Sequence, residues 1–218
     1  KFDEKIDPFQ VLNLLMPLGS QTSLFLLQLD SQTAFVGATP EKLFSRKGRI
    51  LLSEAIAGTK DAQETWGRKE LSEIDAVQVF LQNQLVQCCE KLHWQAPQEK
   101  PFGTLQHLYQ GIEGRLKEEI DDKILLELLH PTPALGGFPQ KEAALYLKTV
   151  EPFSRGWYGS PFGMISPQET EMAVAIRCAL IQGAEMYLFA GAGIVAGSKP
   201  DKEWEELERK IGHFMRKI

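Results

Sequence analysis

The sequence lacks the features that define several large protein classes. No apolar run approaches the roughly 20 residues that a membrane helix needs, and no apolar segment of a signal peptide follows residues 1–5. Basic residues are not in excess, because the formal net charge of the 218 residues is −5. No overall charge therefore attracts nucleic acid or an anionic membrane. We expect a cytoplasmic, monomeric protein that binds neither.

Cysteines are few, and the common catalytic patterns are missing. The three cysteines are odd in number, and Cys88 and Cys89 are adjacent within a helical pattern. They indicate a reducing compartment and packing roles, not disulfides or a zinc site. Nucleophile-elbow, Walker and Cys/His metal patterns are absent. Gly191 and Gly193 lack the third glycine and the strand–helix–strand context of a dinucleotide fingerprint.

The composition is that of an ordinary globular protein, with 43% hydrophobic and 24% charged residues. No Pro-, Ser- or Gly-rich linker divides the chain, which predicts one domain over residues 1–218. Helical patterns, the longest over residues 64–92, alternate with strands joined mostly by hairpins. Residues 156–165 and 171–181 read as two long strands. These patterns favour an α+β fold with large antiparallel sheets.

The sequence pattern over residues 187–210 predicts a strand, a glycine-rich turn and an amphipathic helix. The helix repeats apolar residues in steps of three and four at Trp204, Leu207, Ile211 and Phe214. Three charged residues, Glu203, Glu206 and Lys210, fall on a neighbouring face. Backbone amides, two carboxylates and an ammonium group near one helix start suit a small anion, with or without a metal ion. A solvated Glu206–Lys210 bridge is the plainer alternative.

Two further charged residues lie among apolar neighbours. Glu41 lies between Pro40 and Leu43, where an apolar pocket would raise its pKa and suit it to act as a general acid. A simple turn residue is the alternative. Arg177 lies within an apolar strand pattern, so its guanidinium needs an anionic partner. An internal carboxylate or a ligand would both serve.

Two loops could also contact a ligand. Gly58 and Thr59 offer backbone amides and a hydroxyl group at a strand end, although most such turns are only turns. His130, just before Pro131, could bond a ligand or cap the helix that ends there.

Six sequence blocks occur in one order and together resemble the chorismate-utilising enzymes. The blocks are PEKL at 40–43, AIAGT at 55–59, HPTPA at 130–134, EPF followed by RGWY at 151–158, AIRCA at 175–179 and AGAGIV at 190–195. The resemblance runs from about Ser23 to the C-terminus. HPTPALGGFP, EPFSRGWYG and IRCA look most like isochorismate synthases of the menaquinone or siderophore type.

The resemblance implies a fold and a reaction. The fold would be a sandwich of large antiparallel sheets with helices outside. The reaction would be the conversion of chorismate to isochorismate, in which water attacks C2 and the C4 hydroxyl leaves. By position, Glu41 would be the general acid that protonates the leaving hydroxyl. The attacking water would be activated by a lysine on a strand upstream of Lys1.

The resemblance also implies the ligand contacts. Magnesium would bridge the substrate's ring carboxylate to Glu206, with Glu203 holding metal-bound water. The substrate's carboxylates would be held by Arg177, Lys210 and the amides around Gly191 and Gly193. Gly58 and Thr59 would line the other end of the pocket, and His130 would contact the substrate. Ala134 would leave room for the attacking water.

The long helix departs from the family pattern. Aligning Ser72, Glu73 and Asp75 with the family's Ser-Glu-Lys-Asp pattern puts Gln78 at the position of a metal glutamate. An amide oxygen can ligate magnesium but brings no charge, so Glu73 or Asp75 would have to compensate. Two alternatives therefore stay open: a degenerate module that binds chorismate without turnover, and a salicylate, anthranilate or aminodeoxychorismate synthase.

Overall fold

The computed structural model describes residues 1–18, 22–61, 63–102 and 105–215. The chain folds into two compact units. The first unit comprises Lys1–Glu41, Val174–Ala192 and Lys199–Ile218, and the second comprises Lys42–Ala173 and Gly193–Ser198. Whether the two units make up the single domain expected from the sequence stays a prediction.

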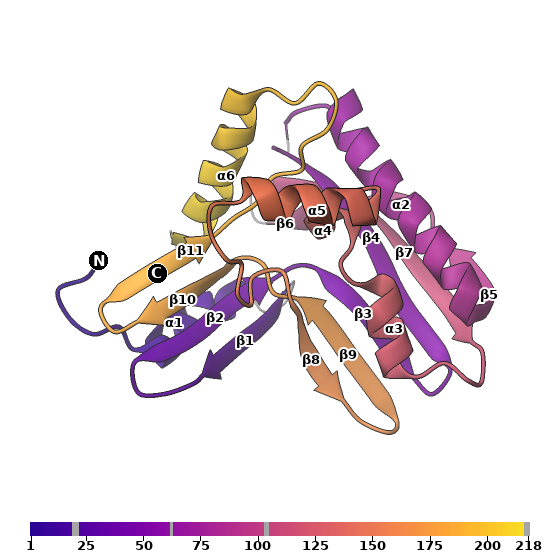
Figure 1. Ribbon diagram of the computed structural model, residues 1–218, viewed down its shortest axis with the longest axis horizontal. Helices are drawn as coiled ribbons and strands as arrows, with labels where there is room; N and C mark the ends of the chain where they lie inside the picture. Colours follow the sequence, from indigo (N-terminus) through magenta and orange to yellow (C-terminus); the bar gives the residue numbers. More distant parts are fainter. Residues whose placement is uncertain (19–21, 62, 103–104, 216–218) are drawn as a thin grey trace. The chain divides into compact units, whose positions relative to one another are not determined.

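The first unit is built on a four-stranded antiparallel sheet with the strand order β1-β2-β10-β11 (Figure 1). Its elements are α1 (Pro8–Leu15), a 3-10 turn η1 (Met16–Leu18), β1 (Ser23–Gln28), β2 (Thr33–Thr39), β10 (Cys178–Gln182), β11 (Glu185–Phe189) and α6 (Pro200–Met215).

The core of the first unit lies between α1 and the sheet. Every second residue of β2 points to this core, because side chains alternate along a strand. Asp7 caps α1 by accepting a hydrogen bond from the N–H of Phe9 at 2.9 Å, and Pro8 fits the first turn. The buried core residues are Val11, Leu15, Ala34, Val36, Ala38, Ala179 and Ile181.

The second unit is built on a seven-stranded sheet. Its strand order is β5-β7-β4-β3-β9-β8, and β6 pairs with β7. The strands are β3 (Lys42–Lys47), β4 (Ile50–Asp61), β5 (Cys89–Trp94), β6 (Gln98–Phe102), β7 (Leu105–Leu116), β8 (Pro161–Ile165) and β9 (Glu169–Val174). The helices are α2 (Arg68–Cys88), α3 (Asp122–Leu129), α4 (Pro133–Gly136) and α5 (Gln140–Val150).

The predicted α+β class with antiparallel sheets is confirmed. The packing of one sheet on the other stays a prediction. The three cysteines are free and buried, as expected for packing roles. None of the helices in the described part of the chain combines the length and the apolar composition that a membrane span needs.

The single strand predicted over residues 171–181 is wrong. The chain forms β9 and β10 in two different sheets. The break is at Arg177, which adopts a left-handed backbone conformation with φ of 51°. A left-handed residue other than glycine is uncommon and cannot continue a strand. Similarly, residues 156–160 form turns, and the strand predicted over 156–165 begins only at Pro161.

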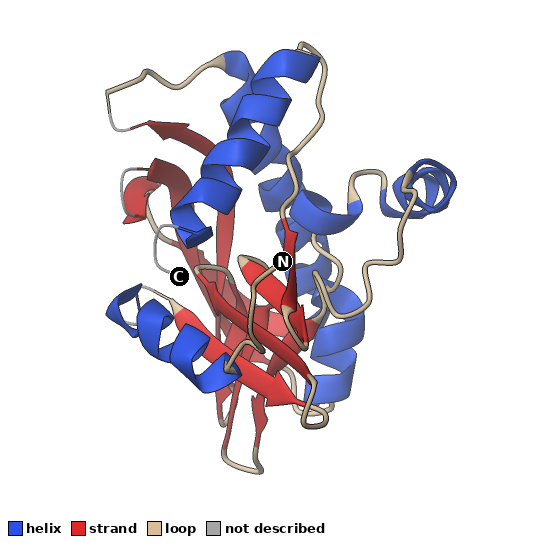
Figure 2. Ribbon diagram, turned by 90° about the vertical axis from the view of Figure 1, so that its left-hand side faces the viewer, coloured by secondary structure: helices blue, strands red, loops and turns tan. Residues whose placement is uncertain are grey.

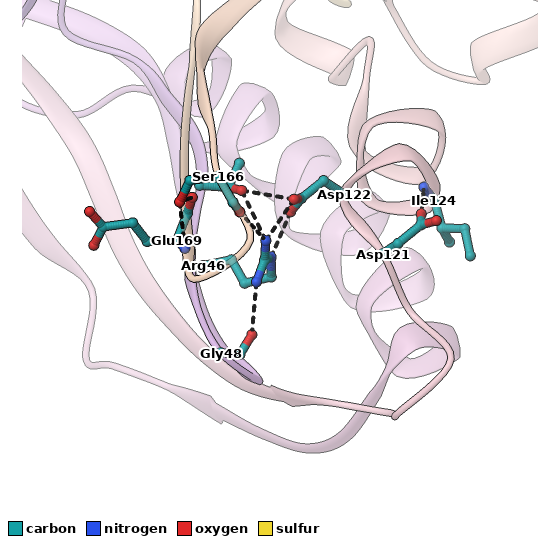
Figure 3. A network of polar contacts seen from close by, with 8 residues as sticks. Arg46, Gly48, Asp121, Asp122, Ile124, Ser166 and Glu169 are labelled. Carbon is teal, nitrogen blue, oxygen red and sulfur yellow. Dashed lines mark hydrogen bonds and ion pairs between the residues drawn. The ribbon is translucent and has the colours of Figure 1, made fainter.

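A buried ionic network ties α3 to the seven-stranded sheet (Figure 3). Arg46 of β3 binds Asp122 in a bidentate pair, with Nε–Oδ1 and Nη2–Oδ2 distances of 2.6 and 2.7 Å. The Thr170 hydroxyl of β9 donates to Asp122 Oδ2 at 2.8 Å. Arg46 also donates to the carbonyls of Gly48 and Ser166. Two strands, a turn and a helix start are therefore fixed by one guanidinium group.

Helix α5 is the least embedded helix of the second unit. None of its residues is buried, and Figure 2 shows it end-on, joined to the rest of its unit by loops. Arg155 fixes the loop that follows it, by donating to Glu151 Oε1 and Oε2 at 2.5 and 2.8 Å and to the Leu135 carbonyl at 2.8 Å. The loop after α5 is thus anchored to α4.

Candidate functional site

Two of the connections that leave the four-stranded sheet are joined by backbone hydrogen bonds and carry two predicted site residues. Glu41 follows β2, and Arg177 precedes β10. The N–H of Ala38 donates to the carbonyl of Arg177 at 3.1 Å, and the N–H of Val174 donates to the carbonyl of Glu41 at 3.1 Å. The first unit therefore brings the backbones of the predicted general acid and the predicted carboxylate-binding arginine together.

Gly191 lies at the same end of that sheet. Cys178, at the start of β10, pairs with Gly37 near the end of β2 and with Phe189 at the end of β11. The residues that follow β2, precede β10 and follow β11 thus share one sheet end. This is the place where the sequence expects substrate carboxylates to bind.

Arg177 meets the conditions for an anion site. It is 8% exposed, and a guanidinium group removed from water needs an anionic partner. Its left-handed backbone costs about 1–3 kcal/mol, a cost that is concentrated at functional sites. An internal carboxylate and a bound ligand remain the two predicted partners.

Helix α6 turns its acidic face inward. Glu203 and Glu206 are buried, at 6% and 5% exposed, whereas Trp204 is 64% exposed. The predicted apolar stripe is therefore wrong at Trp204, whose indole N–H donates to Glu208 at 3.0 Å. The side chain of Phe214 lies outside the described residues. Burial of two carboxylates requires compensating positive charge.

Lys210 supplies part of that charge. Its Nζ lies 2.6 Å from Oε1 of Glu206 and 2.8 Å from the carbonyl of Gly191. Both side chains of the pair are largely buried, so the bridge is not the solvated one that the sequence allowed. One ammonium group thus connects α6 to the glycine turn after β11.

Gly58 lies where only glycine fits. Its φ is +70°, and a Cβ there would lie 2.9 Å from the backbone oxygen of Glu70 in α2. Its carbonyl lies 3.2 Å from Nδ1 of His107, and the ladder between β4 and β7 shifts register between Ala57 and Thr59. The side chain of Thr59 lies outside the described residues.

Helix α2 presents two different polar groups in two directions. The amide of Gln78 donates from Nε2 to Gln110 Oε1 at 2.7 Å. By contrast, the carboxylate of Glu73 lies against the glycine turn, because a Cβ on Gly193 would lie 3.0 Å from Glu73 Cδ. Lys69 lies 3.4 Å from Glu73. The structure therefore gives Glu73 as a rival to Gln78 for the predicted metal position, which itself stays a prediction.

His130 and Ala134 flank one loop of the second unit. His130 follows the last turn of α3, and its N–H donates to the Leu126 carbonyl. Burial lowers the pKa of the His130 imidazole. Its Nδ1 is buried, and among the described residues no group hydrogen-bonds to it. Ala134 is exposed on α4. A neutral imidazole with an unused nitrogen can bind a polar ligand atom, as the resemblance implies.

The donor set suits magnesium by its chemistry. Within the described residues, no three His, Cys, Asp or Glu side chains form a cluster that could hold a metal ion. Magnesium does not need such a cluster, because it is commonly held by one or two carboxylates together with water and substrate oxygens. In the first unit, the two predicted metal-binding carboxylates, Glu203 and Glu206, are both buried, and their binding of magnesium stays a prediction.

The sequence matches the family model described as chorismate binding enzyme over residues 1–218. The chain belongs to this family. It is 39% identical over 198 residues to isochorismate synthase MenF from Haemophilus influenzae, which covers 85% of this chain and 46% of that protein. It is 38% identical over 230 residues to the Bacillus subtilis protein of the same name, with 96% and 47% covered.

A solved structure of the same kind has the same fold. MenF, the menaquinone-specific isochorismate synthase from Escherichia coli, matches with a TM-score of 0.90 and 30% identity, covering 99% of this chain and 53% of that one. The predicted family resemblance is confirmed. The chain spans about half the length of the curated relatives it matches.

The sequence pattern assigns no role to one carboxylate of this family member that the structure makes prominent. Glu54 of β4 accepts a hydrogen bond from the N–H of Lys42, the residue after Glu41. No spacing rule links positions 12 apart on two strands. The available signal was a carboxylate flanked by Ser53 and Ala55, both buried, just before the AIAGT block.

Proposed function

We propose that the protein converts chorismate to isochorismate. The observation that carries the proposal is the pairing of the two connections that hold Glu41 and Arg177. Glu41 and Arg177, which we propose as general acid and anion-binding group, lie in one unit of a chain whose relatives are named isochorismate synthases. In the reaction, water adds to C2 of the ring, the two ring double bonds shift, and the C4 hydroxyl leaves.

Glu41 supplies the proton for the leaving group in this proposal. A hydroxyl group leaves poorly as hydroxide, so protonation of its oxygen in the transition state lowers the barrier. The Glu41 backbone is fixed by the hydrogen bond from Val174 and by donation of its own N–H to the Thr39 hydroxyl at 3.2 Å. Because the backbone that carries it is fixed, the Glu41 carboxyl group can reach the same ring oxygen in each turnover.

The substrate's carboxylates are assigned to cationic and backbone groups. Charge-assisted hydrogen bonds to carboxylates are the strong ones. The carboxylates are therefore held by Arg177, Lys210 and the backbone amides around Gly191 and Gly193. Gly58 and Thr59 line the opposite end of the substrate. Ala134 leaves room for the attacking water, and His130 contacts the substrate.

Magnesium, when bound, would neutralise the ring carboxylate and draw electron density from the ring. Glu206 is the proposed direct ligand, and Glu203 is proposed to hold metal-bound water. The contribution of α2 is Gln78 by sequence alignment, or Glu73 by its charge and its position against Gly193. Magnesium prefers carboxylate oxygen, which favours Glu73.

The direct test is turnover by the full-length natural protein with chorismate and Mg²⁺, assayed for isochorismate. We expect Glu41→Gln to lower kcat by on the order of 10²–10⁴, the usual contribution of general acid catalysis. Glu205→Gln, on the exposed face of α6, is the matched control and keeps kcat. Absence of turnover by the wild-type protein at every Mg²⁺ concentration would overturn the proposal.

A binding module without turnover is the second candidate. The amide at Gln78, held by Gln110 and not by a charged partner, is the observation that favours it. Chorismate that binds with Mg²⁺ dependence but is recovered unchanged would support it. Formation of salicylate, anthranilate or aminodeoxychorismate would point to a relative with another product.

A further inference from the structure

Strands β3 and β4 separate at the end where β3 begins, next to Glu41 in the sequence. Their ladder pairs Ser45 with Leu52 but no residue closer to Glu41. Two side chains of β4 replace the missing ladder bonds. Ser53 Oγ donates to the carbonyl of Leu43 at 2.8 Å, and Oε1 of Glu54 accepts from the N–H of Lys42 at 3.0 Å.

The hydrogen bond from Lys42 completes the fixation of one peptide group. The carbonyl of Glu41 and the N–H of Lys42 belong to the same planar unit. The carbonyl accepts from the N–H of Val174, and the N–H donates to Glu54. With both polar atoms bonded, rotation of this peptide breaks two hydrogen bonds. The direction in which the Glu41 side chain leaves the backbone is thereby set.

Glu54 is itself held in place by a cation. Its other oxygen, Oε2, lies 3.3 Å from Nζ of Lys100. Lys100 Nζ lies over the ring of Tyr109, 4.8 Å from the centroid. The Glu54 side chain is only 7% exposed, and a carboxylate so buried is stable only with such partners. Each oxygen of Glu54 therefore has a partner, and Lys100 holds the carboxylate oriented toward Lys42.

We propose that Glu54 is a positioning residue for the reaction. It holds the Glu41–Lys42 peptide so that the Glu41 carboxyl group points at the leaving hydroxyl of the substrate. The inference rests on the proposed role of Glu41 as general acid. Glu54 does not itself touch the substrate in this scheme, and it acts only through the backbone of the turn.

The test compares Glu54→Ala with Glu54→Gln in the full-length natural protein. Misplacing a catalytic group by about 1 Å costs up to about a hundredfold in rate, so Glu54→Ala should lower kcat tenfold to a hundredfold. KM should change little, because the interaction lost acts in the transition state. Glu54→Gln keeps an acceptor oxygen for Lys42 and should recover kcat to within about fivefold of wild type, since a neutral acceptor is weaker than a charged one.

Asp122→Asn is the matched control for a loss of stability alone. It breaks an ion pair in the same unit whose carboxylate is similarly buried, away from the Glu41–Lys42 turn. It should lower the unfolding midpoint while kcat per folded molecule stays unchanged. Equal kcat losses in Glu54→Ala and Glu54→Gln, or an equal loss in Asp122→Asn, would overturn the proposal, as would wild-type kcat in Glu54→Ala.

Amide hydrogen exchange at Lys42 separates this inference from the proposed function. Exchange at Lys42 should be faster in Glu54→Ala and close to wild type in Glu54→Gln, whether or not the protein turns over chorismate. If the wild-type protein is inactive but exchange at Lys42 still depends on Glu54, the proposed reaction is wrong. The inference that Glu54 fixes the peptide is then still supported. Unchanged exchange in Glu54→Ala would overturn the fixed peptide itself.

Discussion

Lys210 bonds to Glu206 one turn earlier on α6, with 2.6 Å between Nζ and Oε1. The same ammonium group bonds to the Gly191 carbonyl. The carboxylate proposed to bind magnesium is thus neutralised by the residue proposed to bind substrate. Magnesium and the substrate would both bind at this one charged pair. Removing the Lys210 charge should therefore change the affinities for the two ligands in opposite directions.

Lys210→Met should weaken substrate binding and not metal binding. Loss of a hydrogen bond to a charged group costs about 1.5–3 kcal/mol, so KM for chorismate should rise about tenfold or more. Affinity for Mg²⁺ should stay equal or increase, because a competing cation is removed from Glu206. Steady-state kinetics and titration calorimetry with Mg²⁺ measure the two effects.

Lys202→Met is the control for this variant. Lys202 makes an exposed bridge to Glu205 on the same helix, and such pairs contribute little. Neither KM nor Mg²⁺ affinity should change. A fall in both affinities in Lys210→Met, or an unchanged KM, would contradict the assigned role.

Three variants on α2 decide which residue the helix offers to magnesium. Glu73→Gln should lower Mg²⁺ affinity about tenfold or more, because removing one carboxylate removes charge that magnesium prefers. Gln78→Ala should leave the affinity unchanged, since its amide is engaged by Gln110. Asp75→Asn, exposed on the same helix, is the control. If Gln78→Ala lowers the Mg²⁺ affinity more than Glu73→Gln does, Gln78 is the metal ligand, as the sequence alignment predicts.

Two glycine variants separate backbone strain from steric overlap. Gly48 and Gly58 both have a left-handed φ, but a Cβ meets nothing within 4 Å at Gly48 and lies 2.9 Å from Glu70 at Gly58. Gly48→Ala should cost about 1 kcal/mol of unfolding free energy, the price of a left-handed alanine. Gly58→Ala should cost clearly more. If both variants lose the same unfolding free energy in denaturant, α2 moves away from the new methyl group without a measurable loss of stability.

The sequence predicts local elements well where a boundary has a local cause. The helix over Asp122–Leu129 ends at His130, just before Pro131, where the sequence expects a helix end. The break at Arg177 could not be predicted, because the apolar pattern runs through it without a glycine or proline. Only the pairing of β9 and β10 with different sheets shows that one strand is two.

The site residues divide in the same way. The family resemblance identifies single candidate residues such as Glu41 and Arg177. It does not show which contacts hold these residues in place. The Gln78 assignment depended on a short alignment, although helix geometry already limits it. Residues five apart on a helix point about 140° apart, so Glu73 and Gln78 cannot face the same group. The contact of Glu73 with Gly193 is long-range and needed the structure.

The Arg46–Asp122 pair should make stability depend on acid pH (Figure 3). The hydrogen bonds from the Arg46 guanidinium lower the pKa of Asp122, and the Thr170 hydroxyl adds to this. A carboxyl with a lowered folded-state pKa binds its proton more readily in the unfolded chain. Its stabilising contribution is therefore full above about pH 3.9, the ordinary aspartate value. That contribution is lost as pH falls through the folded-state pKa.

Asp122→Asn should remove this dependence and lower stability at neutral pH. Breaking one side of a largely buried pair leaves Arg46 without its charge partner, at a cost of about 2–4 kcal/mol. Unfolding free energies at pH 7 and pH 3 measure both effects. The difference between wild type and variant should be largest at pH 7 and shrink toward pH 3. A difference that stays constant with pH would mean that Asp122 titrates alike in the folded and unfolded chain, contrary to its bonds with Arg46.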